Sequence, residues 1–362
     1  MSISISKNSS EKIRAVSLIC AFLVVLLHAY DQHLTVEDNP LAWYAGKFLS
    51  GGLASIAVPF FFIVSGFLLT KQHDGGMAYG DLLKRRLRSL GVPYVIWCLL
   101  YAMTYMLFTI WGNKLAGRPL NFNTCLALPL SSWQNPFRIF GFDLNGFPAA
   151  GHLWYIRNLL LLVIVSPLLL SLMKSKTTGW CAVAVAAVPY FCHFIIPERF
   201  WQFFESGFSF RGLLFFMIGI QLARFPLNWR PNLFVALSVC LVWFVSAWPW
   251  GLAKTTAFVV FHLSFIVGCV AMWSIYDFLL GHEKLGSWHG AHYSFFIYAS
   301  HYAILNMLFC QKACSLIQRH IVDSDLLIYV IRFVVPVVLA IALAYFLERY
   351  MPKIYRVLTG GR

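Results

Sequence analysis

Ten apolar runs of about 20 residues each constrain the fold of this 362-residue chain more than any other feature. A run of that length spans the hydrocarbon core of a bilayer as one helix. Only 12% of the residues are charged, against roughly a quarter in soluble domains. The sequence therefore predicts an all-α, polytopic membrane protein with one integral-membrane domain over residues 1–362. The predicted spans are 14–31, 52–70, 90–111, 153–173, 178–196, 208–224, 231–249, 254–274, 293–311 and 325–347.

The basic residues predict how these spans are oriented. The formal net charge of +14 would suit nucleic acid if the basic residues formed one soluble face, but here they sort by loop. With the N-terminus inside, 17 of the 28 lysines and arginines fall in cytoplasmic segments and 9 on the opposite side. This bias predicts ten spans with both termini cytoplasmic, and no nucleic-acid partner is expected. Residues 1–13 and 348–362 are then cytoplasmic, and membrane lipids are the surroundings.

The segment 112–151 is the longest break between spans and is predicted to be extracytoplasmic. It is rich in Asn, Pro, Gly and aromatic residues. A loop of this length without its own secondary structure is often functional, and it would line or cover an acceptor site. The alternative is a solvated connector, and the sequence leaves both interpretations open.

His28 is the most informative residue of the first span. Polar groups are costly in hydrocarbon, so an imidazole there faces a bundle interior or a water-filled cavity. Its unperturbed pKa of about 6.5 suits proton transfer near neutrality. A hydrogen bond to a neighbouring helix explains the same placement. Catalysis and packing therefore both remain open for His28.

Further polar residues lie in or beside the spans. In the second span, Ser65 and Gly66 predict tight helix packing or a substrate channel, with Ser65 as nucleophile a remote alternative. His152 and Trp154 open the fourth span at its outer interface. Arg157 lies one helical turn deeper, where a guanidinium needs a carboxylate, carbonyl groups or an anionic substrate.

His301 lies in the ninth span. At 1.5 Å per residue it is roughly 12 Å from the inner end of its span, and His28 is roughly 20 Å from its own, so the two can meet near mid-membrane. His262 and Arg332 are further candidates, for which interhelical hydrogen bonds are the simpler explanation. Nine scattered cysteines, with Cys310 and Cys314 able to share a helix face, give little support for a disulfide, and no metal site is expected.

A basic run at residues 84–88 (Lys-Arg-Arg-Leu-Arg) opens the third span. Cations at a membrane surface normally contact anionic lipid and fix topology. The alternative is a site for a phosphate-bearing donor such as coenzyme A, because the arginine fork binds phosphate with two hydrogen bonds.

These motifs, in this order, resemble the integral-membrane acyltransferase 3 family over nearly the whole chain. The matching segments are 24–28 (VVLLH), 58–62 (VPFFF), 65–68 (SGFL), 92–97 (VPYVIW), 153–159 (LWYIRNL), 166–169 (SPLL), 215–219 (FFMIG), and 297–298 with His301. The chain departs from the family in one place. Ser17 stands where the family usually has a basic residue ahead of His28, and Arg14, which falls within roughly 40° of the same helix face, is its nearest substitute.

The resemblance implies an enzyme that moves an acyl group, with acetyl the expected one, from cytoplasmic acyl-CoA to a hydroxyl of an envelope polysaccharide or lipid-linked saccharide. On this interpretation His28 deprotonates the acceptor or briefly carries the acyl group, and Arg157 or His301 stabilises the oxyanion. Arg14, Arg85 and Arg88 would bind acetyl-CoA, while Ser65, Gly66, His152 and Trp154 would line the substrate path. The alternatives are a transporter or flippase for a lipid-linked saccharide, and then a membrane scaffold.

Overall fold

The computed structural model describes residues 7–118, 139–141, 148–192, 209–227, 231–279, 290–321 and 323–361. Its regular structure within these ranges is helical, as predicted, and these ranges hold no strand. The α-helices up to residue 172 are α1 (Lys7–Leu27), α2 (Pro40–Ala45), α3 (Ala57–Asp74), α4 (Tyr79–Arg86), α5 (Val92–Leu115) and α7 (Trp154–Leu172). Those that follow are α8 (Lys176–Phe191), α10 (Phe210–Arg224), α11 (Leu233–Ala247), α12 (Lys254–Leu279), α13 (Ser294–Ser300), α14 (Gln311–His320), α15 (Asp325–Tyr350) and α16 (Pro352–Thr359). The 3₁₀ and π-helical segments are η1 (Gly46–Gly52), η2 (Leu53–Ile56), η3 (Leu87–Gly91), η5 (Gly151–Leu153), η7 (Ala291–Tyr293) and η8 (His301–Cys310).

Each of the ten predicted spans overlaps helical residues, but the bounds differ by up to seven residues. The helix α1 begins at Lys7 and not at residue 14, and the predicted span 293–311 is divided between α13 and η8. In the described part of the chain, five helical stretches are long and apolar enough to cross a membrane. They are Pro40–Asp74, Tyr79–Leu115, Gly151–Leu172, Thr256–Tyr276 and Asp325–Tyr350. Some of the other helices are shorter: α8 has 16 residues and α10 has 15. Others contain charged or polar residues. Residues 1–6, 119–138, 142–147, 193–196, 208 and 362 of the predicted segments lie outside the described residues.

The stretch Pro40–Asp74 joins α2, η1, η2 and α3 into one continuous helical element. It begins at a defined cap, because the Asn39 side chain accepts a hydrogen bond from the Ala42 N–H at 3.1 Å and Pro40 occupies the first turn. Between Ala42 and Gln72 the axis advances about 45 Å at 1.5 Å per residue, comparable with the thickness of a whole bilayer.

Two glycines let α3 and α10 pack backbone against backbone. A Cβ atom on Gly66 would lie 2.1 Å from the Phe216 carbonyl oxygen, and one on Gly219 would lie 2.0 Å from the Ile63 carbonyl oxygen. Small residues at such crossings allow the close approach that membrane helices use in place of a hydrophobic driving force. The position of Gly66 thus supports the packing interpretation over a substrate channel.

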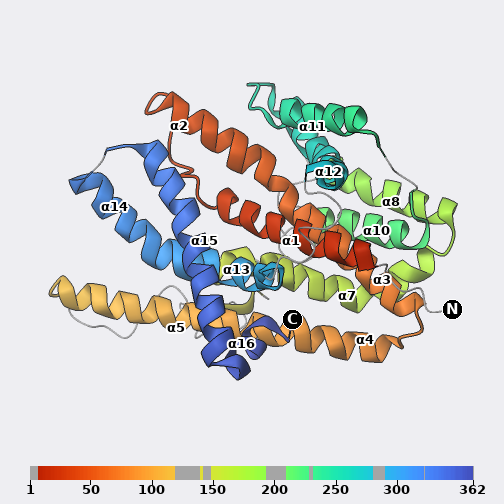
Figure 1. Ribbon diagram of the computed structural model, residues 1–362, viewed down its shortest axis with the longest axis horizontal. Coiled ribbons are helices and arrows are strands. Elements are labelled where there is room, and N and C mark those ends of the chain that lie inside the picture. Colours follow the sequence, from red (N-terminus) through yellow and green to blue (C-terminus); the bar gives the residue numbers. More distant parts are fainter. Residues whose placement is uncertain are drawn as a thin grey trace.

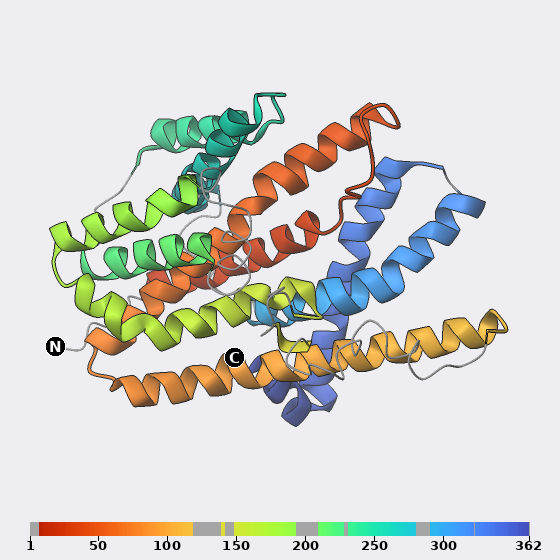
Figure 2. The same cartoon turned by 180° about the vertical axis from the view of Figure 1, so that it is seen from behind.

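The helices form one bundle with two distinct ends. Figures 1 and 2 show α15 inclined steeply to α1, α3, α5 and α7, while α11 and α12 lie together at one side. We call the end that carries α4 and α16 the basic end, and the end that carries the α1–α2 connection and the start of α15 the acidic end. Large apolar side chains such as Leu107 on α5, Phe234 on α11 and Val338 on α15 are exposed on the outside of the bundle, as lipid-facing surfaces require.

Candidate functional site

Three histidines from separate parts of the chain meet inside the bundle. The ring centroids of His28 and His301 are 5.4 Å apart, and those of His152 and His301 are 5.1 Å apart. His152 and His301 are buried, and His28 is partly buried. The predicted proximity of His28 and His301 is therefore confirmed, and His152 joins them.

Each histidine sits where a helix begins, ends or changes its winding. His28 directly follows α1, and its carbonyl accepts a 2.9 Å hydrogen bond from the Asn306 side chain. His152 lies in η5, just before α7, and His301 lies where α13 passes into the π-helical segment η8. Wider turns of this kind occur often at functional sites because they re-aim side chains. Asn306 itself is fully buried within η8.

Backbone carbonyls fix the neutral tautomers of two of the histidines. His301 Nδ1 donates to the Tyr298 carbonyl at 2.8 Å, and His152 Nε2 donates to the Ala299 carbonyl at 3.0 Å. The remaining nitrogens, His301 Nε2 and His152 Nδ1, are buried without a hydrogen-bond partner among the described residues. Each neutral ring therefore presents a bare lone pair, which accepts a proton or a hydroxyl hydrogen bond. In this form His301 has no free N–H group that could donate a hydrogen bond to an oxyanion.

Two tyrosines complete the surroundings of the cluster. The Tyr302 ring lies 4.0 Å from the His28 ring, centroid to centroid, and 5.8 Å from the His152 ring. The Tyr298 hydroxyl donates to the His152 carbonyl at 2.5 Å, which ties α13 to η5. Sequence reasoning missed Tyr302 and Asn306. The sequence did contain a signal for Asn306, namely a polar residue five positions after the candidate histidine His301 in an otherwise apolar span.

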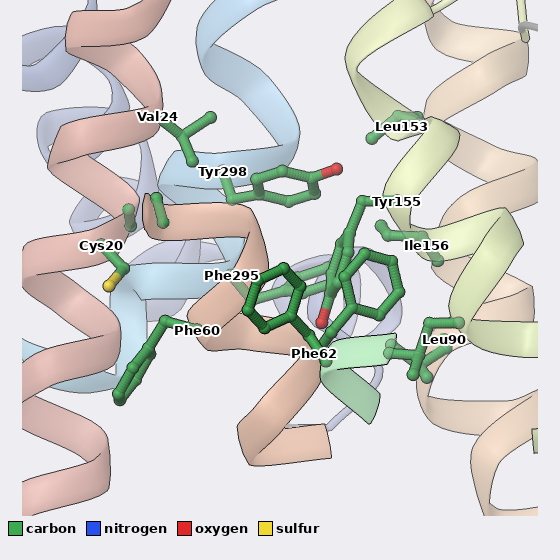
Figure 3. Packing of buried hydrophobic residues seen from close by; sticks show 14 of the residues in the cluster. Cys20, Val24, Phe60, Phe62, Leu90, Leu153, Tyr155, Ile156, Phe295 and Tyr298 are labelled. Atoms are coloured by element: carbon green, nitrogen blue, oxygen red, sulfur yellow. The ribbon is translucent and has the colours of Figure 1, made fainter. Parts of the chain in front are cut away.

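An aromatic path leads from the cluster toward the basic end. Tyr155 packs edge-on against Tyr298 with ring centroids 5.8 Å apart, and its hydroxyl lies 3.1 Å from the Ser65 Oγ. Figure 3 shows Tyr155, Tyr298 and Phe62 side by side between α1 and α7. The predicted residue Ser65 thus lies along this path.

A cavity of about 460 Å³ opens at the basic end. Its lining residues are Gln72, Asp81, Lys84, Arg85, Arg86, Arg88, Ser89, Gly360 and Gly361. Arg85 and Arg88 are exposed, whereas Arg86 points inward, with Nε and Nη2 buried and unpartnered among the described residues. Sequence reasoning placed the basic run correctly but singled out Arg85 and Arg88, because nothing in five consecutive residues says which side chain turns inward.

Helix α16 closes one wall of this cavity. The Trp97 indole N–H donates to the Leu358 carbonyl at 3.0 Å, which holds α16 against α5. Gly360 adopts a left-handed conformation with φ +70°, and a Cβ atom there would lie 2.2 Å from the Ser89 carbonyl oxygen. Only glycine fits this close approach.

Arg157 and Trp154 make contacts other than those that their predicted roles require. The buried Arg157 guanidinium donates to the Gly141 carbonyl, and the Tyr94 hydroxyl donates to the Phe140 carbonyl at 2.7 Å. Together they hold segment 139–141 of the predicted loop against α5 and α7. The Trp154 ring carries the Arg211 guanidinium 5.1 Å from its centroid. An oxyanion role for Arg157 and a channel role for Trp154 stay predictions.

Arg14 does not occupy a buried position on α1. It is exposed, while Lys12 is buried with its ammonium 4.2 Å from the centre of the Trp273 ring. Lys12 was missed because the sequence does not reveal which cation of the first helix faces α12. A donor-binding role for Arg14 stays a prediction.

Comparison with known proteins identifies the family. The family model described as an acyltransferase domain matches residues 13–349. The chain belongs to this acyltransferase family. The acyltransferase is also 24% identical over 322 residues to the succinoglycan biosynthesis protein ExoH of Rhizobium meliloti (strain 1021), a match that covers 87% of this chain and 81% of that relative. No solved structure matches the acyltransferase.

Family membership makes the chain an enzyme and a transferase, so the transporter and scaffold alternatives fall away. Within the described residues, no group of three or more His, Cys, Asp or Glu side chains is arranged to hold a metal ion. The histidine cluster of the acyltransferase offers lone pairs at His301 Nε2 and His152 Nδ1, which suit general acid–base chemistry.

Proposed function

We propose that this protein is an inner-membrane acyltransferase that moves an acyl group, acetyl in the simplest case, from cytoplasmic acyl-CoA to a hydroxyl of an extracytoplasmic polysaccharide or lipid-linked saccharide. The observation that carries the proposal is the cluster of His28, His152 and His301 inside the bundle, together with a cavity rich in arginine at its basic end. The relative's name, which refers to succinoglycan biosynthesis, supports a polysaccharide acceptor.

The basic cavity supports donor binding at one membrane face. Four cationic side chains, those of Lys84, Arg85, Arg86 and Arg88, line it with one carboxylate, that of Asp81. Coenzyme A carries several phosphate charges that such a lining would bind. The inward guanidinium of Arg86 would hold the phosphates or the thioester oxygen at the entrance to the aromatic path, with Arg85 and Arg88 at the rim.

The histidines would perform the transfer. A histidine lone pair takes the proton of the acceptor hydroxyl while the hydroxyl oxygen attacks the thioester carbonyl carbon. The tetrahedral intermediate then collapses, the carbon–sulfur bond breaks, and the thiolate of coenzyme A leaves and takes up a proton. His28 is the base of this proposal, while His152 and His301 position the hydroxyl and relay its proton.

The arrangement of charge supports the orientation of the chain. The arginine-rich cavity lies at the basic end, and a second cavity lies at the acidic end. Positive charge favours the cytoplasmic side, so the basic end would face the cytoplasm, with ten spans and both termini inside. Donor and acceptor would then enter from opposite faces of the membrane.

The test is a transfer assay on purified protein in proteoliposomes. Labelled acetyl-CoA and a polysaccharide acceptor are supplied, and the acylated product is detected by mass spectrometry. We expect His28→Ala to abolish product with normal membrane insertion. We expect Arg86→Gln to raise the acyl-CoA Kd by about one to two decades, for a lost contact of about 1–3 kcal/mol.

The double variant Arg85→Gln with Arg88→Gln serves as the matched comparison, with a smaller expected loss of donor affinity because both side chains are exposed. Wild-type product from inserted His28→Ala would remove His28 from the mechanism. An unchanged donor Kd in Arg86→Gln would leave the basic run as a lipid anchor.

A further inference from the structure

A second cavity, of about 230 Å³, opens at the acidic end directly beyond the histidine cluster. It is lined by Ala29 and Tyr30, which follow His28 in the chain, and by residues from the α1–α2 connection, α14 and α15. Its volume corresponds to about eight waters at roughly 30 Å³ each, which suits one sugar ring but not an oligosaccharide.

The cavity adjoins the last turn of α1 through a hydrogen-bonded floor. The Ser50 Oγ donates to the Leu26 carbonyl at 2.5 Å and lies 2.8 Å from the hydroxyl of Tyr329, a lining residue. Since His28 follows Leu26 by two residues, a molecule seated in the cavity lies beside the entrance to the histidine cluster.

The lining includes the carboxylates of Asp31, Asp38 and Asp325, and neighbouring groups hold each of them in place. Asp31 accepts from the Arg332 guanidinium at 3.0 Å. Asp325 accepts from the Gln318 amide at 2.9 Å and from the Asn39 amide at 3.2 Å. Both carboxylates are thus oriented before any ligand arrives, which lowers the entropic cost of binding one.

Asp38 is the third carboxylate of the lining. The Thr35 hydroxyl, at 2.7 Å, and the Thr35 backbone N–H, at 3.0 Å, hold the pKa of Asp38 below its ordinary value. Asp38 is therefore ionised at neutral pH. Three acidic lining residues against one arginine make the cavity net negative.

This chemistry favours a neutral, hydroxyl-rich ligand. Carboxylates accept hydrogen bonds from sugar hydroxyls but repel carboxylated or phosphorylated sugars. A cation is the other ligand that carboxylates attract, but those of the described residues do not converge into a metal-binding group. The Tyr30 and Tyr329 rings add the apolar faces that a sugar ring also needs.

We infer that this cavity is the acceptor subsite and that it binds an uncharged glycosyl residue, so that the enzyme discriminates against acidic sugars next to the acylated hydroxyl. The inference rests on the proposed function. Asp31, Asp38 and Asp325 determine the specificity, and the hydroxyl to be acylated projects from the cavity toward His28.

The test compares two tetrasaccharides as acceptors, neutral cellotetraose and anionic tetragalacturonate. The acceptor KM of the wild-type protein should be at least tenfold lower for cellotetraose than for tetragalacturonate. The variants Asp31→Asn and Asp38→Asn should raise the cellotetraose KM about tenfold and narrow the difference between the two sugars, with the acyl-CoA Kd unchanged. Glu37→Gln is the matched control, because Glu37 is exposed in the same connection and does not line the cavity.

Equal KM values in the variants and the control, or a preference for tetragalacturonate, would overturn the inference. Saturation-transfer NMR of cellotetraose on the purified protein tests this inference separately from the proposed function. Binding that Asp38→Asn weakens, without acyl transfer to any acceptor, would support the subsite and sink the proposed function. Transfer to another acceptor without cellotetraose binding would support the proposed function and overturn the inferred subsite.

Discussion

The hydrogen bonds of His301 and His152 decide what these side chains contribute. Each ring gives its one proton to a backbone carbonyl, so the other nitrogen has only a lone pair to offer. Placed 5.1 Å apart between ring centroids, the two imidazoles form a proton-accepting pair next to His28. In the proposed mechanism they position the acceptor hydroxyl and relay the proton that His28 accepts, rather than stabilise an oxyanion.

This assignment predicts that His301→Asn lowers kcat by about 10²–10⁴-fold, the usual contribution of a positioned base. The asparagine amide can still donate to the Tyr298 carbonyl, so the helix junction is kept while the lone pair at Nε2 is lost. Transfer kinetics and thermal melting of the purified variant give the measurement.

His320→Asn is the control, because His320 is exposed at the end of α14. Wild-type kcat in folded His301→Asn would show that the ring only packs.

Among the elements, α3 and α10 pack with their backbones in close approach at Gly66 and Gly219. Gly66→Ala should destabilise the protein by about 1–3 kcal/mol, because its Cβ would meet the Phe216 carbonyl at 2.1 Å and push two backbones apart. Thermal melting in detergent measures this. Gly112→Ala in α5 should have little effect, since nothing lies within 4 Å of a Cβ there. A normal melting temperature with loss of acyl transfer would instead support the interpretation that Gly66 lines a substrate channel.

The helices themselves could be predicted from sequence, because a run of about 20 apolar residues has few other solutions in a membrane. The local windings could not. The sequence showed a span at 293–311 but not the π-helical segment His301–Cys310 that aims His301 and Asn306. That winding depends on tertiary hydrogen bonds, such as the one from Asn306 to His28, which no local pattern encodes.

The site was predictable to the same extent. Helix rise alone put His28 and His301 at compatible depths, and the structure brings them together. Which of Arg85, Arg86 and Arg88 points inward depends on helix rotation, at 100° per residue, relative to α7 and α16. The same holds for Lys12 and Arg14 on α1, where packing against Trp273 selects the buried cation.

At the scale of the whole molecule, the proposed direction of acyl transfer depends on which membrane face each cavity opens to. If the basic end faces the cytoplasm, an impermeant maleimide should label Lys114→Cys, at the end of α5, on intact spheroplasts. Gly80→Cys, in the first turn of α4 with nothing within 4 Å of a Cβ atom, should react only after permeabilisation. Both variants are made in a background that lacks the nine native cysteines. The opposite labelling pattern would reverse the direction of acyl transfer.

The contact between Gly360 and Ser89 also bears on how the enzyme is made. During translation, α4 and η3 are synthesised early, but the wall that α16 contributes to the basic cavity is added only after the other described helices. A nascent chain therefore holds all three histidines before its basic cavity is closed. If that cavity binds acyl-CoA as proposed, ribosome-bound and interrupted chains cannot yet turn over the cellular thioester pool.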